Sequence, residues 1–285
     1  MGVKATLDAH GLHPQKKWGQ NFLTDARILE SIADAAQVGP EDTVLEIGPG
    51  LGHLTRVLSR RAARVVAVEI DRDLAARLTA DFADTPNIEI VCGDILQFDP
   101  GKLIATKGGI VASAAFKVVA NLPYYITSAI LRHLLEASHK PSIVVVMVQR
   151  EVALRMAAQP PEMSLLAVSV QFFASIHIVR TLSAGAFYPR PKVDSAVVRL
   201  EVFVPPRPIE DTNWFFEIVR AGFGERRKQL RNSLAHGLTL DSNTVAAALT
   251  RAHIEPTRRA ETLTLEEWST LYHALAPHPR AGAKA

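Results

Sequence analysis

The segment 121–125, Asn-Leu-Pro-Tyr-Tyr, carries the clearest indication of chemistry in the chain. It follows three apolar residues, 118–120, that are typical of the end of a buried strand. In an open α/β sheet, ligands bind at the carboxyl ends of the strands. An uncharged amide, a rigid turn and aromatic faces at such a place suit a flat, hydrogen-bonding substrate such as a nucleobase. Taken alone, the segment is equally typical of a strand end with an ordinary Asn-Pro-type turn and core tyrosines.

A second set of groups lies at other predicted strand ends. Residues 46–52, Glu-Ile-Gly-Pro-Gly-Leu-Gly, form a turn that lets the backbone pass close to a ligand before a helix begins. The turn matches neither the dinucleotide fingerprint nor the phosphate loop, and without a basic partner it fits a carboxylate better than a pyrophosphate. Glu69 ends the next strand, where it can accept both hydroxyls of a ribose. Asp94 ends the third strand, where it can accept from an exocyclic amine. A ligand with a carboxylate, a ribose and an adenine in that order is S-adenosylmethionine, although a glycine-rich turn alone would indicate only a tight strand–helix connection.

The elements that must position these groups alternate along the chain. Short aliphatic runs predict parallel strands at residues 43–47, 64–70, 88–92, 117–120 and 142–148, with amphipathic helices between them. A further helix is expected from a cap at Thr24 or Asp25 to about Gln37. This alternation is typical of a doubly wound, Rossmann-like α/β domain. The runs 167–179 and 196–204 predict additional strands, some antiparallel.

A proline-rich linker at residues 205–208 precedes a change of pattern. Beyond it the periodicity is helical without strands, and we expect helices at residues 212–223, 225–236, 242–251 and 265–274. Basic residues crowd the first two of these helices: Arg220, Arg226, Arg227, Lys228 and Arg231. Positions 227 and 231 would share a helix face, which favours a phosphate-binding surface over its alternative, a solvated helix face.

The sequence therefore predicts an α/β domain that binds S-adenosylmethionine at residues 1–205, a small all-α domain with a basic surface at 206–276 and a disordered tail at 277–285. The net charge of +3 and the pI of about 9.1 permit a nucleic-acid partner. We expect no metal, since His, Cys and Asp do not cluster at ligand spacing, and no membrane, since apolar runs stay below about 18–20 residues. The single cysteine, Cys92, fits a reducing cytoplasm and is expected to be a small buried residue.

Seven separated motifs together resemble the ribosomal RNA adenine dimethyltransferases of the bacterial small-subunit type. They are Gln-Asn-Phe-Leu at 20–23, Glu-Ile-Gly-Pro-Gly at 46–50, Glu-Ile-Asp at 69–71, Gly-Asp at 93–94, the segment 121–125, Gln-Arg-Glu-Val-Ala at 149–153 and Phe-Tyr-Pro-Arg-Pro-Lys-Val-Asp-Ser at 187–195. The resemblance spans nearly the whole chain. It departs at residues 162–164, where the family often has a Tyr-Gly pair.

The resemblance implies an S-adenosylmethionine-dependent enzyme that methylates twice the N6 of two adjacent adenines in a hairpin near the 3′ end of 16S rRNA. Its partners would be 16S rRNA or an immature 30S subunit, and the enzyme a monomer. Carried over by motif, the cofactor-binding positions are Gln20, Asn21, Leu23, Gly48, Gly50, Glu69, Ile70, Gly93, Asp94, Ile95 and Asn121. Asn121 and the carbonyl of Leu122 would orient N6, and Tyr124 and Phe187 would sandwich the extruded base, unless the two rings are plain core packing.

Two other functions share parts of this pattern. A 23S rRNA methyltransferase of the antibiotic-resistance type has the same cofactor motifs, although residues 124–126 and 193–195 look more like the small-subunit group. A non-enzymatic RNA-binding assembly factor is the other, and the presence of Glu69, Asp94 and Asn121 argues against lost catalysis.

Overall fold

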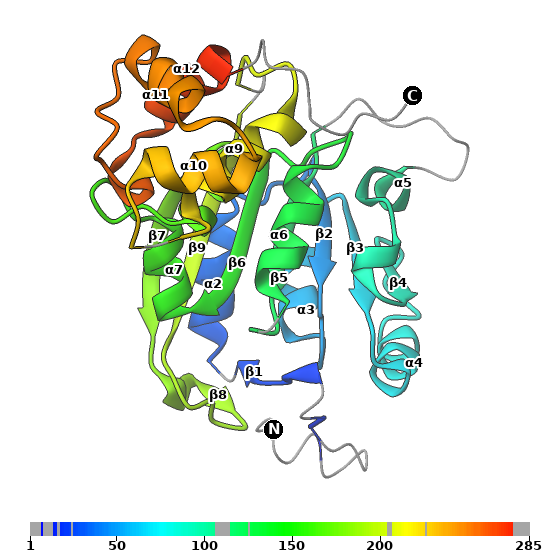
Figure 1. Cartoon of the computed structure of the whole chain (residues 1–285). Coiled ribbons are helices and arrows are strands. Elements are labelled where there is room, and N and C mark those ends of the chain that lie inside the picture. Colours follow the sequence, from blue (N-terminus) through cyan, green and yellow to red (C-terminus); the bar gives the residue numbers. More distant parts are fainter. Residues whose placement is uncertain are drawn as a thin grey trace. The chain divides into compact units, whose positions relative to one another are not determined.

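The computed structural model (Figure 1) describes residues 7, 14–15, 18–23, 25–105, 115–124, 126–203, 207–225 and 227–275. The chain divides into two compact units. The first is Met1–Leu154 with Ala174–Phe203, and the second is Arg155–Phe173 with Val204–Ala285.

The first unit is built on a seven-stranded sheet with the order β4-β3-β2-β5-β6-β9-β7 over the described residues. Its parallel strands are β2 (Thr43–Ile47), β3 (Arg64–Glu69), β4 (Ile88–Cys92), β5 (Lys117–Asn121) and β6 (Ile143–Gln149). Two further strands, β9 (Ser195–Val202) and β7 (Ala174–Leu182), add to β6 in antiparallel pairing. The predicted Rossmann-like α/β architecture is confirmed, and the chain order reverses direction between β2 and β5, where ligands bind in such sheets.

Helix α2 (Ala26–Ala35) precedes the first parallel strand. The helices between the parallel strands are α3 (His53–Ser59), α4 (Arg72–Asp81), α5 (Pro100–Ile104) and α6 (Thr127–Leu135), and α7 (Arg150–Met156) follows β6. Asp25 and Asp71 cap α2 and α4 through their side chains. α6 has no side-chain cap, because the residue before it is Ile126, which makes no side-chain cap hydrogen bond. Thr127 Oγ1 instead donates to the carbonyl of Pro123.

One core packs α2 and α3 against the sheet. Ile32 and Leu58 meet Val119 and Val145 there, all of them nearly inaccessible to solvent. Burying side chains of this size contributes about 1.5–3 kcal/mol each, which makes this packing the main force that holds α2 in place.

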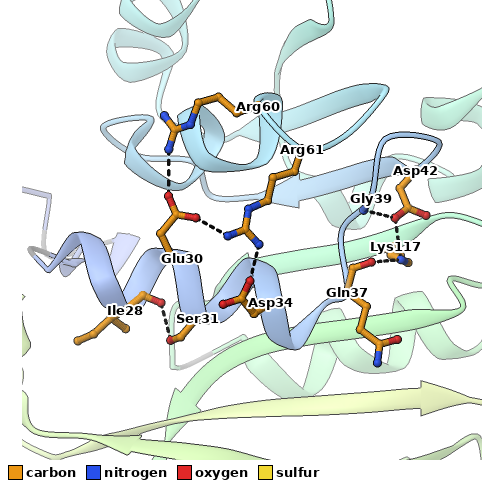
Figure 2. A network of polar contacts seen from close by, with 10 residues as sticks. All are labelled: Ile28, Glu30, Ser31, Asp34, Gln37, Gly39, Asp42, Arg60, Arg61 and Lys117. Carbon is orange, nitrogen blue, oxygen red and sulfur yellow. Dashed lines mark hydrogen bonds and ion pairs between the residues drawn. The ribbon is translucent and has the colours of Figure 1, made fainter.

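A polar network at the surface supplements that packing (Figure 2). Glu30 accepts from Arg60 and Arg61, and Arg61 also donates to Asp34 at 2.6 Å. Such exposed ion pairs contribute about 0–1 kcal/mol each. Together the packing and the pairs fix α2, which follows the N-terminal arm, residues 18–23.

The second unit is helical: α8 (Leu165–Gln171), α9 (Thr212–Phe223), α10 (Leu230–Leu238), α11 (Ser242–Arg251) and α12 (Leu265–Leu275). It includes residues 155–173, which we expected in the first domain. The reason is aromatic packing: the ring centroids of Phe172 lie 4.6 Å from Phe215 and 5.2 Å from Phe216. The strand expected from residue 167 is therefore wrong up to residue 173, where the chain forms α8 instead.

Two further expectations are corrected. The helix expected at 225–236 begins only at Leu230, because the chain first makes a turn in which Lys228 N donates to the carbonyl of Glu225 at 3.0 Å. Cys92 is exposed rather than buried, because β4 is the edge strand of the sheet. Within the described residues, no helix has the length and apolar character needed to cross a membrane.

Candidate active site

A cavity opens at the carboxyl ends of β2, β3, β4 and β5, and every position expected to contact the cofactor lines it. These positions come from the N-terminal arm, from the β2–α3 turn and from the ends of β3, β4 and β5. Residues far apart in sequence thus meet at one place, as parallel strands require.

The β2–α3 turn forms one wall of this cavity. Gly50 has a φ of +58°, which favours glycine, and a β-carbon there would lie 2.9 Å from the ring of Phe22. Gly48 also has a positive φ, of +71°. The turn therefore presents bare backbone to the cavity, and a side chain at position 50 would collide with the arm.

Glu69 ends β3 and is only 4% exposed. Its Oε2 accepts from the backbone N–H of Gly50, and its Oε1 accepts from that of Asp71, both at 3.0 Å. These bonds fix the carboxyl group, while each oxygen keeps a second lone pair for a ligand hydroxyl. Burial raises the pKa of Glu69, and the two backbone donors oppose that rise.

Asp94 lies directly after Gly93, beyond the end of β4. Its Oδ1 accepts from the backbone N–H of Leu96 at 3.0 Å, which caps a short 3₁₀ turn, Ile95–Gln97. That bond uses one oxygen and leaves Oδ2 able to accept from a ligand amine.

Asn121 is the last residue of β5. Its side-chain Nδ2 donates to the backbone carbonyl of Asn21 at 3.0 Å. One of the two hydrogens of the amide nitrogen is therefore used by the N-terminal arm, and Oδ1 is left to accept from a ligand. Leu122 and Tyr124 follow it along the cavity.

Tyr124 is held at the rim of the cavity. A hydrogen bond of 2.8 Å joins its Oη to Ser195 Oγ at the start of β9. Burial raises the pKa of the Tyr124 hydroxyl, and the bond to Ser195 opposes the rise. The ring has a fixed orientation, which suits a stacking surface.

Phe187 is placed differently. It belongs to β8 (Phe187–Tyr188), which pairs with β1 (Phe22–Leu23), and it packs in the core with Leu29 and Ile32. Only 4% of its surface is exposed, and it does not line the cavity. The structure does not bring Phe187 together with Tyr124 around a common space.

Two ionisable residues of the cavity were not singled out from the sequence as site residues. Glu46 is 1% exposed, and its Oε2 has no hydrogen-bond partner. Burial raises its pKa to about 8; the Thr55 side chain opposes the rise and the Glu69 carboxyl adds to it. His53, at the start of α3, has its pKa lowered mainly by burial. Glu46 lies in the glycine-rich motif, so the motif was the available signal, whereas nothing in the sequence marked His53.

The basic residues of the second unit are only partly available. Arg220 and Arg227 are exposed, but Lys228 forms an ion pair with Glu225. Arg231 donates to the carbonyl and hydroxyl of Ser242, at 3.2 and 2.7 Å. The expectation that positions 227 and 231 share a helix face is wrong, because α10 begins at Leu230. Arg226, like Thr24 and Tyr125 of the first unit, lies outside the described residues.

The part of the chain that the structure describes contains no cluster of three or more His, Cys, Asp or Glu side chains that could hold a metal ion.

Comparison with known proteins adds to this geometry. The family model described as ribosomal RNA adenine dimethylase matches residues 11–276. The protein named ribosomal RNA small subunit methyltransferase A from Dehalococcoides mccartyi is 46% identical, over 97% of this chain and 94% of that protein. The protein of the same name from Moorella thermoacetica is 45% identical, over 95% of this chain and 96% of that protein.

Two solved structures of RNA-modifying and dimethyladenosine-forming enzymes are similar to this chain. The 23S rRNA methyltransferase ErmE is 31% identical with a TM-score of 0.70, covering 90% of this chain and 100% of that chain. A dimethyladenosine transferase from Plasmodium falciparum shares the fold, at 23% identity and a TM-score of 0.76 over 90% of this chain and 97% of that chain. With a family model covering most of its length and relatives this similar, the chain belongs to the ribosomal RNA adenine dimethylase family.

Proposed function

We propose that this protein transfers methyl groups from S-adenosylmethionine to N6 of two adjacent adenines in the 3′-terminal hairpin of 16S rRNA, twice to each. The observation that carries the proposal is Asn121, whose amide is anchored so that Oδ1 is left to accept at the cavity that the cofactor positions line. Membership of the family supports the reaction class.

The described residues fit the cofactor. Glu69 holds a carboxyl group with spare lone pairs for two ribose hydroxyls, and Asp94 keeps one oxygen for the adenine amine. The bare backbone of the β2–α3 turn suits the methionine end. When bound, S-adenosylmethionine supplies an electrophilic methyl group on a sulfonium ion.

The role of Asn121 follows from the chemistry of adenine. The N6 lone pair is delocalised into the ring, which makes the amine a poor nucleophile. If Asn121 Oδ1 and the Leu122 carbonyl each accept an N6 hydrogen, the lone pair turns out of the ring plane toward the methyl group. Good alignment contributes several kcal/mol, within the range of about 7–11 kcal/mol for ideal proximity. A strong base is not required, because the amine becomes acidic only after transfer.

The second methylation leaves a single hydrogen on N6. One of the two acceptors, Asn121 Oδ1 or the Leu122 carbonyl, then loses its donor. The adenine must therefore adopt a different orientation in the site for the second transfer. Tyr124 provides a stacking face worth about 1–3 kcal/mol, and its bond to Ser195 keeps that face in place.

The proposed substrate is the small-subunit rRNA, in an immature 30S particle, and the proposed enzyme is a cytoplasmic monomer. The names of the relatives at 45–46% identity support this target, while ErmE, a 23S rRNA enzyme, is 31% identical. Primer extension on both rRNAs distinguishes the two targets. If the protein is an assembly factor without catalytic activity, primer extension detects no methylation of either rRNA.

The test of the proposal is Asn121→Ala. This variant should bind S-adenosylmethionine within a few fold of the wild type by calorimetry. Its single-turnover rate on 30S particles should fall by about 10²–10³, as for loss of one preorganised polar contact. Mass spectrometry of the 16S rRNA measures the product, and a wild-type rate in this variant would overturn the proposed role of Asn121.

A further inference from the structure

The N-terminal arm, defined here as residues 18–23, reaches across the cavity to the end of β5. The contact is made by main chain rather than by a side chain: the carbonyl of Asn21 accepts from Asn121 Nδ2 at 3.0 Å. A carbonyl has no hydrogen to donate, so the group that faces it must be a donor. The arm thereby determines which end of the Asn121 amide points away from it.

The arm is itself held to the rest of the unit at two places, and a further hydrogen bond lies within it. Gln20 Nε2 donates to Asp71 Oδ2 at the start of α4, at 3.0 Å. The side chain of Asn21 donates to the carbonyl of Gly19 at 2.9 Å, across a turn in which Gly19 has a φ of +59°. Phe22 pairs with Tyr188 in the short β1–β8 sheet. The Asn21 carbonyl is thus carried by a backbone with fixed neighbours on both sides.

We propose that the main-chain carbonyl of Asn21 is a positioning group for catalysis, because it fixes the Asn121 amide with Oδ1 toward the substrate. The inference builds on the proposed function of Asn121. The same contact explains why position 121 carries an amide rather than a carboxylate, since the Asn21 carbonyl needs a donor opposite it.

The distinction between amide and carboxylate follows from the contact. Asn and Asp have nearly the same shape, so shape alone predicts that Asn121→Asp retains more activity than Asn121→Ala. A carboxylate, however, would place an oxygen where Nδ2 now lies, 3.0 Å from a carbonyl oxygen. Two acceptors at that separation repel, unless the carboxyl group holds a proton and donates it to Asn21. Titratable groups on the surrounding elements also face this cavity. Four of them are acids, Glu46, Glu69, Asp94 and Tyr124, and the fifth, His53, is a base.

Those of the acids that are ionised favour the protonated form of a new carboxyl group, by like-charge repulsion. Glu46 and Tyr124 add no such repulsion below about pH 8, because burial raises the pKa of Glu46 to about 8 and that of the Tyr124 hydroxyl above its ordinary value. Activity of Asn121→Asp relative to the wild type should therefore rise at least tenfold between pH 8 and pH 6, while the ratio for Asn121→Ala stays level. Dividing by the wild-type rate at each pH removes the titration of groups common to both proteins.

A measurement on the cofactor-free protein tests the contact without activity. At pH 8, where the carboxyl group of Asn121→Asp is ionised, hydrogen exchange of the backbone amides of the arm should accelerate by a factor of about 2–10 in both Asn121 variants, the size of effect that one hydrogen bond makes. Asn87→Asp is the matched control, since Asn87 Nδ2 also donates to backbone carbonyls, those of Ser59 and Ala62. That control should leave exchange in the arm unchanged.

Arm exchange at the wild-type rate in both Asn121 variants would overturn the positioning role. A pH-independent activity ratio for Asn121→Asp would do the same. The proposed function fails separately: Asn121→Ala would then methylate rRNA at the wild-type rate while exchange in the arm still accelerates.

Discussion

Glu46 gives this protein a pH-dependent stability that its composition does not reveal. The side chain lies in β2, beside the cavity, with 1% of its surface exposed and with Oε2 unpartnered. Burial raises its pKa from an ordinary 4.5 to about 8. The folded state therefore holds the Glu46 proton over a range of pH in which the unfolded chain releases it.

The sign of the effect follows from that difference. A group with a raised pKa in the folded state contributes stability that is complete below pH 4.5 and is lost as the pH rises through 8. At about 1.4 kcal/mol per pKa unit, the free energy of unfolding should fall by roughly 3 kcal/mol between pH 5 and pH 8 from this group alone. Glu46→Gln replaces the carboxyl with a neutral amide of the same shape and should remove this part of the pH dependence.

The assay is native-state hydrogen exchange of the most protected amides of β2 and β3, at pH 5 to 8, corrected for intrinsic exchange rates. These strands report the first unit alone, so separate unfolding of the helical unit does not interfere. The Glu69 carboxyl is present in both proteins, so its contribution to the pH dependence of unfolding is common to them. If the wild type and Glu46→Gln lose stability in parallel over this range, Glu46 is ionised in the folded protein and the reasoning is refuted.

Three further predictions concern the cofactor site and the RNA surface. Glu69→Ala should weaken S-adenosylmethionine binding by about 1.5–3 kcal/mol in calorimetry, the scale of charged hydrogen bonds; unchanged affinity in the folded variant would exclude Glu69 from the ribose site. Replacing Arg220 and Arg227 with Ala should raise the KM for rRNA and flatten its salt dependence without changing cofactor affinity; an unaltered salt slope would mark them as a solvated surface. Gly50→Ala should cost about 1–2 kcal/mol of stability through its left-handed backbone and displace Phe22, and an unchanged melting temperature would contradict this.

The sheet and its ligand-bearing end were predictable because local pattern and topology agree there. Runs such as residues 43–47 and 88–92 are aliphatic and are separated by amphipathic segments, which determines a parallel sheet. In such a sheet Glu69, Asp94 and Asn121 have to converge at one edge. All three line the cavity at that edge.

Other features depend on contacts that no local pattern contains. The pairing of β1 with β8 joins two-residue strands more than a hundred residues apart, and it is what draws Phe187 into the core. The apolar run after Ser164 resembles a strand, but Ser164 accepts from Ala167 N at 3.1 Å and the aromatic packing of Phe172 favours a helix. The burial of Glu46 likewise follows from the layers above and below β2, not from its motif.

The division of the helical unit into two chain segments affects how the protein is made. Phe172 and Phe173 emerge from the ribosome before Phe215 and Phe216, which lie some 40 residues further on. At about 5–20 residues per second, these rings wait roughly 2–8 s for their partners. During that interval an apolar surface is open to aggregation, while residues 174–203 complete the sheet-bearing unit with β7, β8 and β9. A truncation at the proline-rich linker would make this transient exposure permanent, because the partners of Phe172 and Phe173 lie beyond it.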